Sequence, residues 1–228
     1  MTAFAGFTTA LYEFFEDLED ENRKEWFDVH RQVYLDQVKA PLQALLDELE
    51  PEFGKAKLFR INRDTRFSAD KSPYKTQQGA IISAGAAGTR YVHVDADGIM
   101  VGVGAPHLDR EQLKRWRAAV AGDPGDQLAE IVGTLRAGGF TVGTLASEGL
   151  TEEGDLKRVP KPYPPDHPRA DLLRLKKVVA AQAWARPAWL LDRRAVAMVA
   201  EAWRTAAPLG DWLAANVGAA AGDHGRRR

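Results

Sequence analysis

The sequence predicts an α+β fold, in which an antiparallel sheet of about four to six strands is packed by helices from both the N-terminal and the C-terminal segments. Apolar residues recur at helical spacing before residue 50 and again after residue 109. Between these regions, short apolar runs follow one another through short links, which is typical of neighbouring antiparallel strands. Because no repeat and no sharp change of composition divides the chain, we expect one domain over residues 1–217 and a disordered basic tail over residues 218–228.

The first fifty residues carry the pattern of three helices. In the first, apolar residues recur at i, i+3, i+4 and i+7, at Leu11, Phe14, Phe15 and Leu18. The spacing of Asn22 and Glu25 predicts a capping box at the start of the second helix. Its expected apolar face comprises Trp26, His30, Val33 and Tyr34. Pro41 either begins a third, leucine-rich helix as its first residue or kinks one continuous helix, and the pattern fits both alternatives.

Strand patterns occupy the middle of the chain. Phe59 and Ile61 alternate with polar residues, which predicts a half-buried strand, and residues 79–85 form a second short apolar run. Two more apolar runs flank the pair Asp97-Gly98, which supplies the positive φ of a tight turn. We therefore expect a hairpin there, within an antiparallel sheet.

Helical spacing returns in the C-terminal half. Asp109 and Gln112 predict a capping box and a helix that buries Trp116. A second helix is expected to begin at Pro124 and to end at Gly138, and residues 140–144 predict another strand. We further expect a helix over residues 172–179 and a long last helix around residues 196–206.

The composition excludes several classes of protein and site. Without cysteine, the chain has no disulfides, thiolate zinc sites or cysteine nucleophiles. Its N-terminus lacks the basic region of a signal peptide, and no apolar run approaches the roughly 20 residues of a membrane span, so we expect a cytoplasmic protein without a membrane partner. The net charge of −1 argues against a general nucleic-acid binder. The histidines show no metal-ligand spacing, and no Walker or dinucleotide motif is present, so we expect neither a metal nor a cofactor.

Charge concentrates in residues 59–79, whereas the rest of the chain is balanced. This stretch carries the cations Arg60, Arg63, Arg66, Lys71 and Lys75 and the carboxylates Asp64 and Asp70. Such a cluster makes either an anion-binding site or an internal ion-pair network. If the segment is extended, one face carries Arg60, Asn62, Asp64 and Arg66, while Phe59, Ile61 and Phe67 anchor the other.

A second candidate segment is the loop over residues 156–168, which combines several prolines with three cations and a tyrosine. A loop that proline has already stiffened loses less entropy when it orders around a partner. Functional residues are also common on loops that a rigid scaffold presents. The alternative is a connector that wraps the domain without binding anything.

The run from Arg60 to Thr76, of the form R-I-N-R-D-T-R-F-S-x-D-K-S-P-Y-K-T, resembles the signature of a widespread microbial family. This family of conserved hypothetical proteins is catalogued as domain of unknown function 2461. Residues 22–31, 102–104 and 156–168 resemble further landmarks of the family, so the resemblance extends over about residues 7–212. It implies an intracellular α+β domain. Because the family has no established activity, no catalytic residue is carried over.

We expect the protein to bind a small anionic ligand that bears phosphate or carboxylate, and an enzyme of unspecified reaction is compatible with the pattern. The expected ligand-binding residues are Arg60, Arg63, Asp64, Arg66, Asp70, Lys71, Tyr74, Lys75, Lys157 and Arg158. The arginines of the cluster would hold the anion, the two aspartates would orient them or act as a base, and the others would complete the site. The alternative is a non-catalytic module that docks a protein or a nucleic acid, with the Arg/Asp cluster as a structural ion-pair network.

Overall fold

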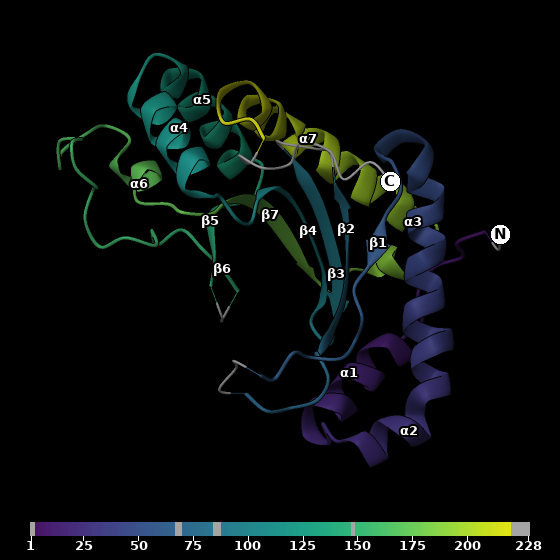
Figure 1. Ribbon diagram of the computed structural model, residues 1–228. Coiled ribbons are helices and arrows are strands. Elements are labelled where there is room, and N and C mark those ends of the chain that lie inside the picture. The colour runs from purple at the N-terminus through teal and green to yellow at the C-terminus, as the bar shows by residue number, and fades with distance from the viewer. Residues whose placement is uncertain (1–2, 67–69, 84–87, 147–148, 220–228) are drawn as a thin grey trace, which may run out of the picture. The chain divides into compact units, whose positions relative to one another are not determined.

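The computed structural model describes residues 3–66, 70–83, 88–146 and 149–219 (Figure 1). The chain divides into two compact units. The first comprises residues 1–82, 91–101 and 183–201, and the second comprises residues 83–90, 102–182 and 202–228. Of the predicted basic tail, residues 220–228 lie outside the described part of the chain.

The strands of the described residues form one seven-stranded sheet in the order β1-β2-β3-β4-β7-β5-β6. They are β1 (Lys57–Leu58), β2 (Gln77–Ser83), β3 (Thr89–Asp95), β4 (Gly98–Ala105), β5 (Thr141–Ala146), β6 (Gly149–Thr151) and β7 (Val178–Ala185). Antiparallel pairing joins β1 to β2, and it joins β5 to both β6 and β7. The α+β class is thus confirmed, but the expected number of four to six strands is too small. Two of the strands, β1 and β6, have only two and three residues, which is too short to give an alternating pattern.

In the first unit, α1 (Ala10–Asp20) buries the four apolar residues that predicted it. The second helical pattern becomes α2 (Lys24–Val33), the π-helical segment η1 (Tyr34–Lys39) and α3 (Ala40–Phe53), which follow one another without a break (Figure 1). Both alternatives for Pro41 therefore hold in part: Pro41 lies in the first turn of the leucine-rich helix α3, and the helical backbone continues into α3 from η1. Proline has no N–H and crowds the carbonyl one turn before it, and the wider π-helical turn just before Pro41 accommodates both effects.

The predicted capping box of the second helix is wrong. Helix α2 begins at Lys24, and no side chain caps it. The Asn22 side chain instead binds the backbone of Tyr74, which lies far away in the sequence. The expected apolar face also needs correction, because Val33 is exposed and Phe27 is buried in its place.

In the second unit, the capping box of α4 (Arg110–Ala121) is confirmed. The Gln112 N–H donates to Asp109 Oδ1 at 2.8 Å, and the Asp109 N–H donates to Gln112 Oε1 at 3.0 Å. The second unit also contains α5 (Pro124–Ala137), α6 (Ala170–Leu173) and the C-terminal part of α7 (Arg194–Asn216). The N-terminal residues of α7 belong to the first unit, as does η2 (Ala188–Leu191). Trp116 of α4 and Trp212 of α7 meet edge to face at 5.6 Å, and Trp212 Nε1 donates to the Pro124 carbonyl at 2.9 Å. These contacts join the C-terminal part of α7 to α4 and to the start of α5 (Figure 1).

The helix predicted over residues 172–179 is confirmed only at residues 172–173 and is wrong beyond them. Helix α6 ends at Leu173, and Val178 begins β7. This strand lies between β4 and β5, and its residues from Val178 to Ala181 are all buried. A strand that is covered on both faces reads as a continuous apolar run, and periodicity alone cannot distinguish such a run from a buried helix.

Candidate functional site

Residues 57–66 and 70–81 form the two arms of a long irregular hairpin in the first unit. Beyond the short pairing of β1 with β2, the Phe59 N–H donates to the Gly79 carbonyl at 2.9 Å, and the Lys75 N–H donates to the Ile61 carbonyl at 2.9 Å. Ile61 is buried, whereas Arg60 is exposed, which agrees with the predicted alternation. The strand predicted through Phe59 and Ile61 is wrong, however, because β1 ends at Leu58 and residues 59–61 belong to no strand. The predicted anchoring role of Phe67 falls on a residue outside the described part of the chain.

Two of the three arginines in the hairpin have carboxylate partners within it. Arg66 donates two hydrogen bonds to Asp64, from Nε to Oδ1 at 3.0 Å and from Nη2 to Oδ2 at 2.7 Å. Arg63 pairs with Asp70 through Nη1 and Oδ2 at 3.0 Å. The side-chain and backbone hydrogen bonds from Arg66 lower the pKa of Asp64, and the bonds from Ser72 lower the pKa of Asp70. Both carboxylates therefore stay ionised at neutral pH.

The two lysines of the hairpin bind backbone carbonyl oxygens. Lys71 Nζ donates to the Thr65 carbonyl at 2.9 Å, and Lys75 Nζ donates to the Arg60 carbonyl at 3.0 Å. Burial lowers the pKa of Lys75, and the charges of Arg60 and Arg63 lower it further. Burial is the larger of these two effects on Lys75, and the charges of the two arginines add to it.

A pocket of about 260 Å³ opens where the hairpin meets the continuous helix, and we call it the helix–hairpin pocket. The helical side contributes Asp28, Arg31, Tyr34 and Lys39, and the hairpin contributes Arg60 and Tyr74. Within the described residues, no hydrogen bond or ion pair engages the side chains of Arg31, Lys39 or Arg60. Three cations with free hydrogen-bonding capacity therefore share this pocket with one carboxylate.

Two tyrosines form a fixed part of the pocket. Tyr34 Oη donates to Gln78 Oε1 at 2.6 Å, and Gln78 Nε2 in turn donates to the Phe59 carbonyl at 2.8 Å. The Tyr74 ring stacks on Phe27 at a centroid distance of 4.0 Å. Burial raises the pKa of Tyr34 to about 12, and burial together with the charge of Asp28 raises the pKa of Tyr74. Both phenols are therefore neutral at physiological pH and can donate hydrogen bonds.

The structure brings Arg60 and Tyr74 of the predicted set into the helix–hairpin pocket. The remaining hairpin residues, Arg63, Asp64, Arg66, Asp70, Lys71 and Lys75, do not line it. The residues predicted from the sequence did not include Asp28, Arg31 or Lys39 of the helix. Asp28 and Arg31 are three residues apart, and Lys39 follows eight residues later, which is about two helical turns, so this pattern of charge on one helix face could have indicated them.

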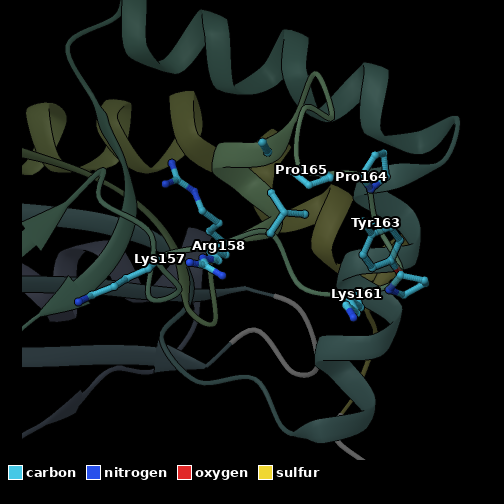
Figure 2. A pocket seen from close by; sticks show the side chains of 10 residues that line it. Lys157, Arg158, Lys161, Tyr163, Pro164 and Pro165 are labelled. Atoms are coloured by element: carbon cyan, nitrogen blue, oxygen red, sulfur yellow. The ribbon is translucent and has the colours of Figure 1, made fainter.

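Lys157 and Arg158 belong to the second unit, where they line another pocket of about 830 Å³ (Figure 2). We call it the proline-loop pocket, because residues 157–165 form most of its lining. Whether these two cations also act with the arginines of the hairpin stays a prediction.

Within residues 3–66, 70–83, 88–146 and 149–219, no group of three or more His, Cys, Asp or Glu side chains could hold a metal ion. None of the helices in the same ranges is both long enough and apolar enough to span a membrane.

Comparison with curated proteins and comparison with solved structures gave no match. A family model for conserved hypothetical proteins, DUF2461, matches residues 10–212. This range covers the hairpin, the continuous helix and the proline loop. It agrees with the extent of about residues 7–212 that the motif and the other landmarks of the sequence predicted. The chain therefore belongs to the DUF2461 family.

Proposed function

We propose that the protein binds a small anionic ligand, bearing a phosphate or carboxylate group, in the helix–hairpin pocket. The observation that carries the proposal is the presence of Arg31, Lys39 and Arg60 around one cavity, without a hydrogen-bond or ion-pair partner in the described part of the chain. Asp28 is the carboxylate of this lining, so cations outnumber it three to one. An anion that enters the pocket gains charge-assisted hydrogen bonds that the protein itself does not satisfy.

The residue types match this chemistry. A guanidinium group presents a planar fork that can bind two oxygens of a phosphate or carboxylate at once, and Arg31 and Arg60 supply two such forks from opposite elements. The Tyr74 phenol adds a neutral donor. The volume of about 260 Å³ lies near the lower end of the range for ligand pockets, so a small metabolite suits it better than a large cofactor.

The rest of the charged hairpin supports this pocket from outside. Lys75 binds the Arg60 carbonyl, and Arg63 Nε donates to the Tyr74 carbonyl at 3.4 Å, so cations next to the pocket hold the backbone of Arg60 and Tyr74. Asp70 keeps Arg63 in place. In this proposal, the ion pairs of the signature motif position Arg60 and Tyr74, and the ligand does not contact them directly.

The test is isothermal titration of the protein with inorganic phosphate, a sugar phosphate and succinate. We expect binding of at least one of them, and we expect Arg60→Gln and Lys39→Gln each to weaken it tenfold or more, because each removes a charge-assisted contact. Arg66→Gln is the matched control, since it removes one positive charge from the same hairpin outside the pocket. An equal loss in Arg66→Gln and Arg60→Gln, or no binding by any of the three anions, would contradict the proposal.

A non-catalytic docking role is the second candidate, and the exposure of the Arg66–Asp64 pair favours it. The Arg66 side chain is 76% exposed, and its partner is 44% exposed. Such an exposed ion pair contributes little to stability. Its presence in the signature motif is therefore better explained by contact with a partner at the surface. Titration with labelled RNA at two salt concentrations tests this role. We then expect binding that falls steeply with salt and that Arg66→Gln weakens, whereas salt-independent binding or none would exclude a nucleic-acid partner.

A further inference from the structure

We infer that the proline-loop pocket binds a polyanionic ligand that also carries a flat apolar ring, the chemistry of a nucleoside diphosphate. This inference goes beyond the proposed function, because it concerns another pocket with an entirely different set of lining residues. Three features of the pocket support it: unpaired cations, an apolar side, and a loop that is already fixed in place.

The first feature is charge. Four of the ten residues that line the pocket are cations, Lys157, Arg158, Lys161 and Arg174, and none is a carboxylate. In the described part of the chain, no hydrogen bond or ion pair engages any of these four side chains. The Nε atom of Arg174 is buried and has no hydrogen-bond partner. Because no carboxylate neutralises these four side chains, an anion in the pocket gains charge-assisted hydrogen bonds that the protein itself does not satisfy.

Other arginines of this unit show that the sequence could have paired these cations. Arg136 binds Glu152 at 2.9 Å and also approaches Asp171 at 3.5 Å. Arg169 pairs with Asp126 and donates to three backbone carbonyls. Arg136 and Arg169 thus have carboxylate or carbonyl partners within the protein, whereas the four cations that line the pocket have none in the described part of the chain. Glu152 and Glu153 do line a neighbouring pocket with Lys157 and Arg174, but neither of these cations forms an ion pair with them.

The second feature is the apolar side of the pocket. Pro162, Tyr163, Pro164 and Pro165 contribute it, together with Val159. Figure 2 shows Lys157 and Arg158 on one side of the pocket and Tyr163 on the other with Pro164, while Lys161 lies near Tyr163. A ligand that bridges the two sides needs oxygens at one end and a flat apolar group at the other. The volume of about 830 Å³ is large enough for such a molecule and exceeds the space that a lone phosphate requires.

The third feature is a loop that is fixed before any ligand arrives. The Leu156 N–H donates to the Arg174 carbonyl at 3.1 Å, which joins two edges of the pocket. Asp155 accepts from Thr144 Oγ1 at 3.0 Å and from the Lys176 N–H at 2.5 Å. Within the loop, the Tyr163 N–H donates to the Pro160 carbonyl at 3.2 Å. Because these bonds and the prolines restrict the loop, binding costs less conformational entropy.

The experiment is isothermal titration of the full chain, without added metal, with ADP, pyrophosphate and adenosine. We expect ADP to bind at least tenfold more tightly than either of the other two, because only ADP reaches both sides of the pocket. The double variant Lys157→Gln/Arg158→Gln should weaken ADP binding tenfold or more, and Tyr163→Leu should weaken ADP but not pyrophosphate. Lys114→Gln is the matched control, since Lys114 is an exposed cation of the same unit that pairs with Glu111 on α4.

Three results would overturn the inference. The first is no ADP binding at millimolar concentration by a chain that circular dichroism shows to be folded. The second is a loss of binding free energy in Lys114→Gln that is half or more of the loss in the double variant. Because the double variant removes two charges and Lys114→Gln removes one, this result would mean attraction by net charge alone. The third is loss of ADP binding in Arg60→Gln without loss in the double variant, which would assign the ligand to the helix–hairpin pocket. Phosphate or succinate binding that depends on Arg60 tests the proposed function separately.

Discussion

Asn22 and Tyr74 exchange two hydrogen bonds across 52 positions of sequence: Asn22 Nδ2 donates to the Tyr74 carbonyl at 3.1 Å, and the Tyr74 N–H donates to Asn22 Oδ1 at 3.1 Å. The amide thus satisfies both backbone groups of Tyr74 and joins the irregular hairpin to the start of α2. Because Tyr74 lines the helix–hairpin pocket, this pair of bonds fixes one edge of the proposed site.

Replacing Asn22 should therefore loosen the hairpin. We expect Asn22→Ala to lower the free energy of unfolding by about 1–3 kcal/mol, because both backbone groups of Tyr74 lose a partner in a half-buried place. Urea denaturation followed by circular dichroism measures the change. Gln32→Ala, an exposed site on the same helix, is the control and should change stability by less than about 0.5 kcal/mol. Equal stability of Asn22→Ala and the wild type would contradict this account.

Two glycines should respond to alanine in opposite directions. Gly98 ends the hairpin turn between β3 and β4 with φ of 140°, and an added Cβ would collide with the Trp184 carbonyl. We expect Gly98→Ala to lower the free energy of unfolding by about 1–3 kcal/mol or more. Gly133 lies inside α5, and a Cβ there would meet nothing within 4 Å. Gly133→Ala should therefore stabilise the protein by about 0.5–1 kcal/mol, since alanine favours helix. Thermal unfolding of the two variants compares them directly, and a shift in the same direction would contradict the prediction.

Arg169 stabilises the C-terminal end of α4. Its Nε donates to the Val120 carbonyl at 2.6 Å, and its Nη2 donates to the Gly122 carbonyl at 3.1 Å. These carbonyls have no partner inside the helix, so the guanidinium both caps the helix and complements its dipole. We expect Arg169→Lys to cost about 2–3 kcal/mol, because an ammonium cannot reach several carbonyls at once.

The ion pair of Arg169 with Asp126 should matter far less than this cap. The Asp126 side chain is 80% exposed, so we expect Asp126→Asn to cost less than about 1 kcal/mol. Chemical denaturation of both variants separates the two contributions. If Asp126→Asn were as damaging as Arg169→Lys, the ion pair and not the cap would be the main role of Arg169.

Asp95 should make the stability depend on acid pH. Asp95 Oδ2 accepts from His93 Nε2 at 3.0 Å, His93 Nδ1 lies 2.9 Å from Tyr91 Oη, and Asp95 Oδ1 accepts from the Gly98 N–H at 2.9 Å. Burial acts to raise the pKa of Asp95, but these hydrogen bonds outweigh it, so the pKa lies below its ordinary value of 3.8. The ionised carboxylate therefore stabilises the fold fully above that value, and this stabilisation is lost as the pH falls through the lower pKa of the folded state.

We expect Asp95→Asn to flatten the fall of unfolding free energy between about pH 5 and about pH 2 relative to the wild type. Glu19 faces Asp95 and Asp97, and burial together with these charges raises its pKa. Glu19→Gln is consequently the necessary second variant, because Glu19 contributes to pH dependence with the opposite sign. Urea denaturation at several pH values gives the slopes, and an unchanged slope in Asp95→Asn would refute the assignment.

Local patterns predicted those elements whose determinants lie close together in the sequence. The capping box of Asp109 and Gln112 sets the start of α4 because both of its hydrogen bonds lie within four residues. The turn at Gly98 and the stripe that α1 buries follow from equally local causes. The motif at residues 60–76 was in turn long enough to indicate the family.

The same reasoning failed where a distant partner decides the outcome. Asn22 has the right spacing for a cap, but Tyr74 competes for its amide. Val178 begins a strand because β4 and β5 lie on either side of β7 in the sheet and pair with it. Nothing in residues 172–179 themselves distinguishes that strand from a buried helix.

The sequence by itself determined the α+β class, most helices, the family and the concentration of charge in one hairpin. Only the tertiary structure decided how those charges are used. It paired Arg63 and Arg66 with neighbouring carboxylates, and it placed Arg60 in a pocket with Arg31 and Lys39 from a helix about 20–30 residues earlier. The physical reason is that an ion pair or a pocket depends on distances of a few ångströms in space, whereas sequence patterns record only the spacing along one helix or strand.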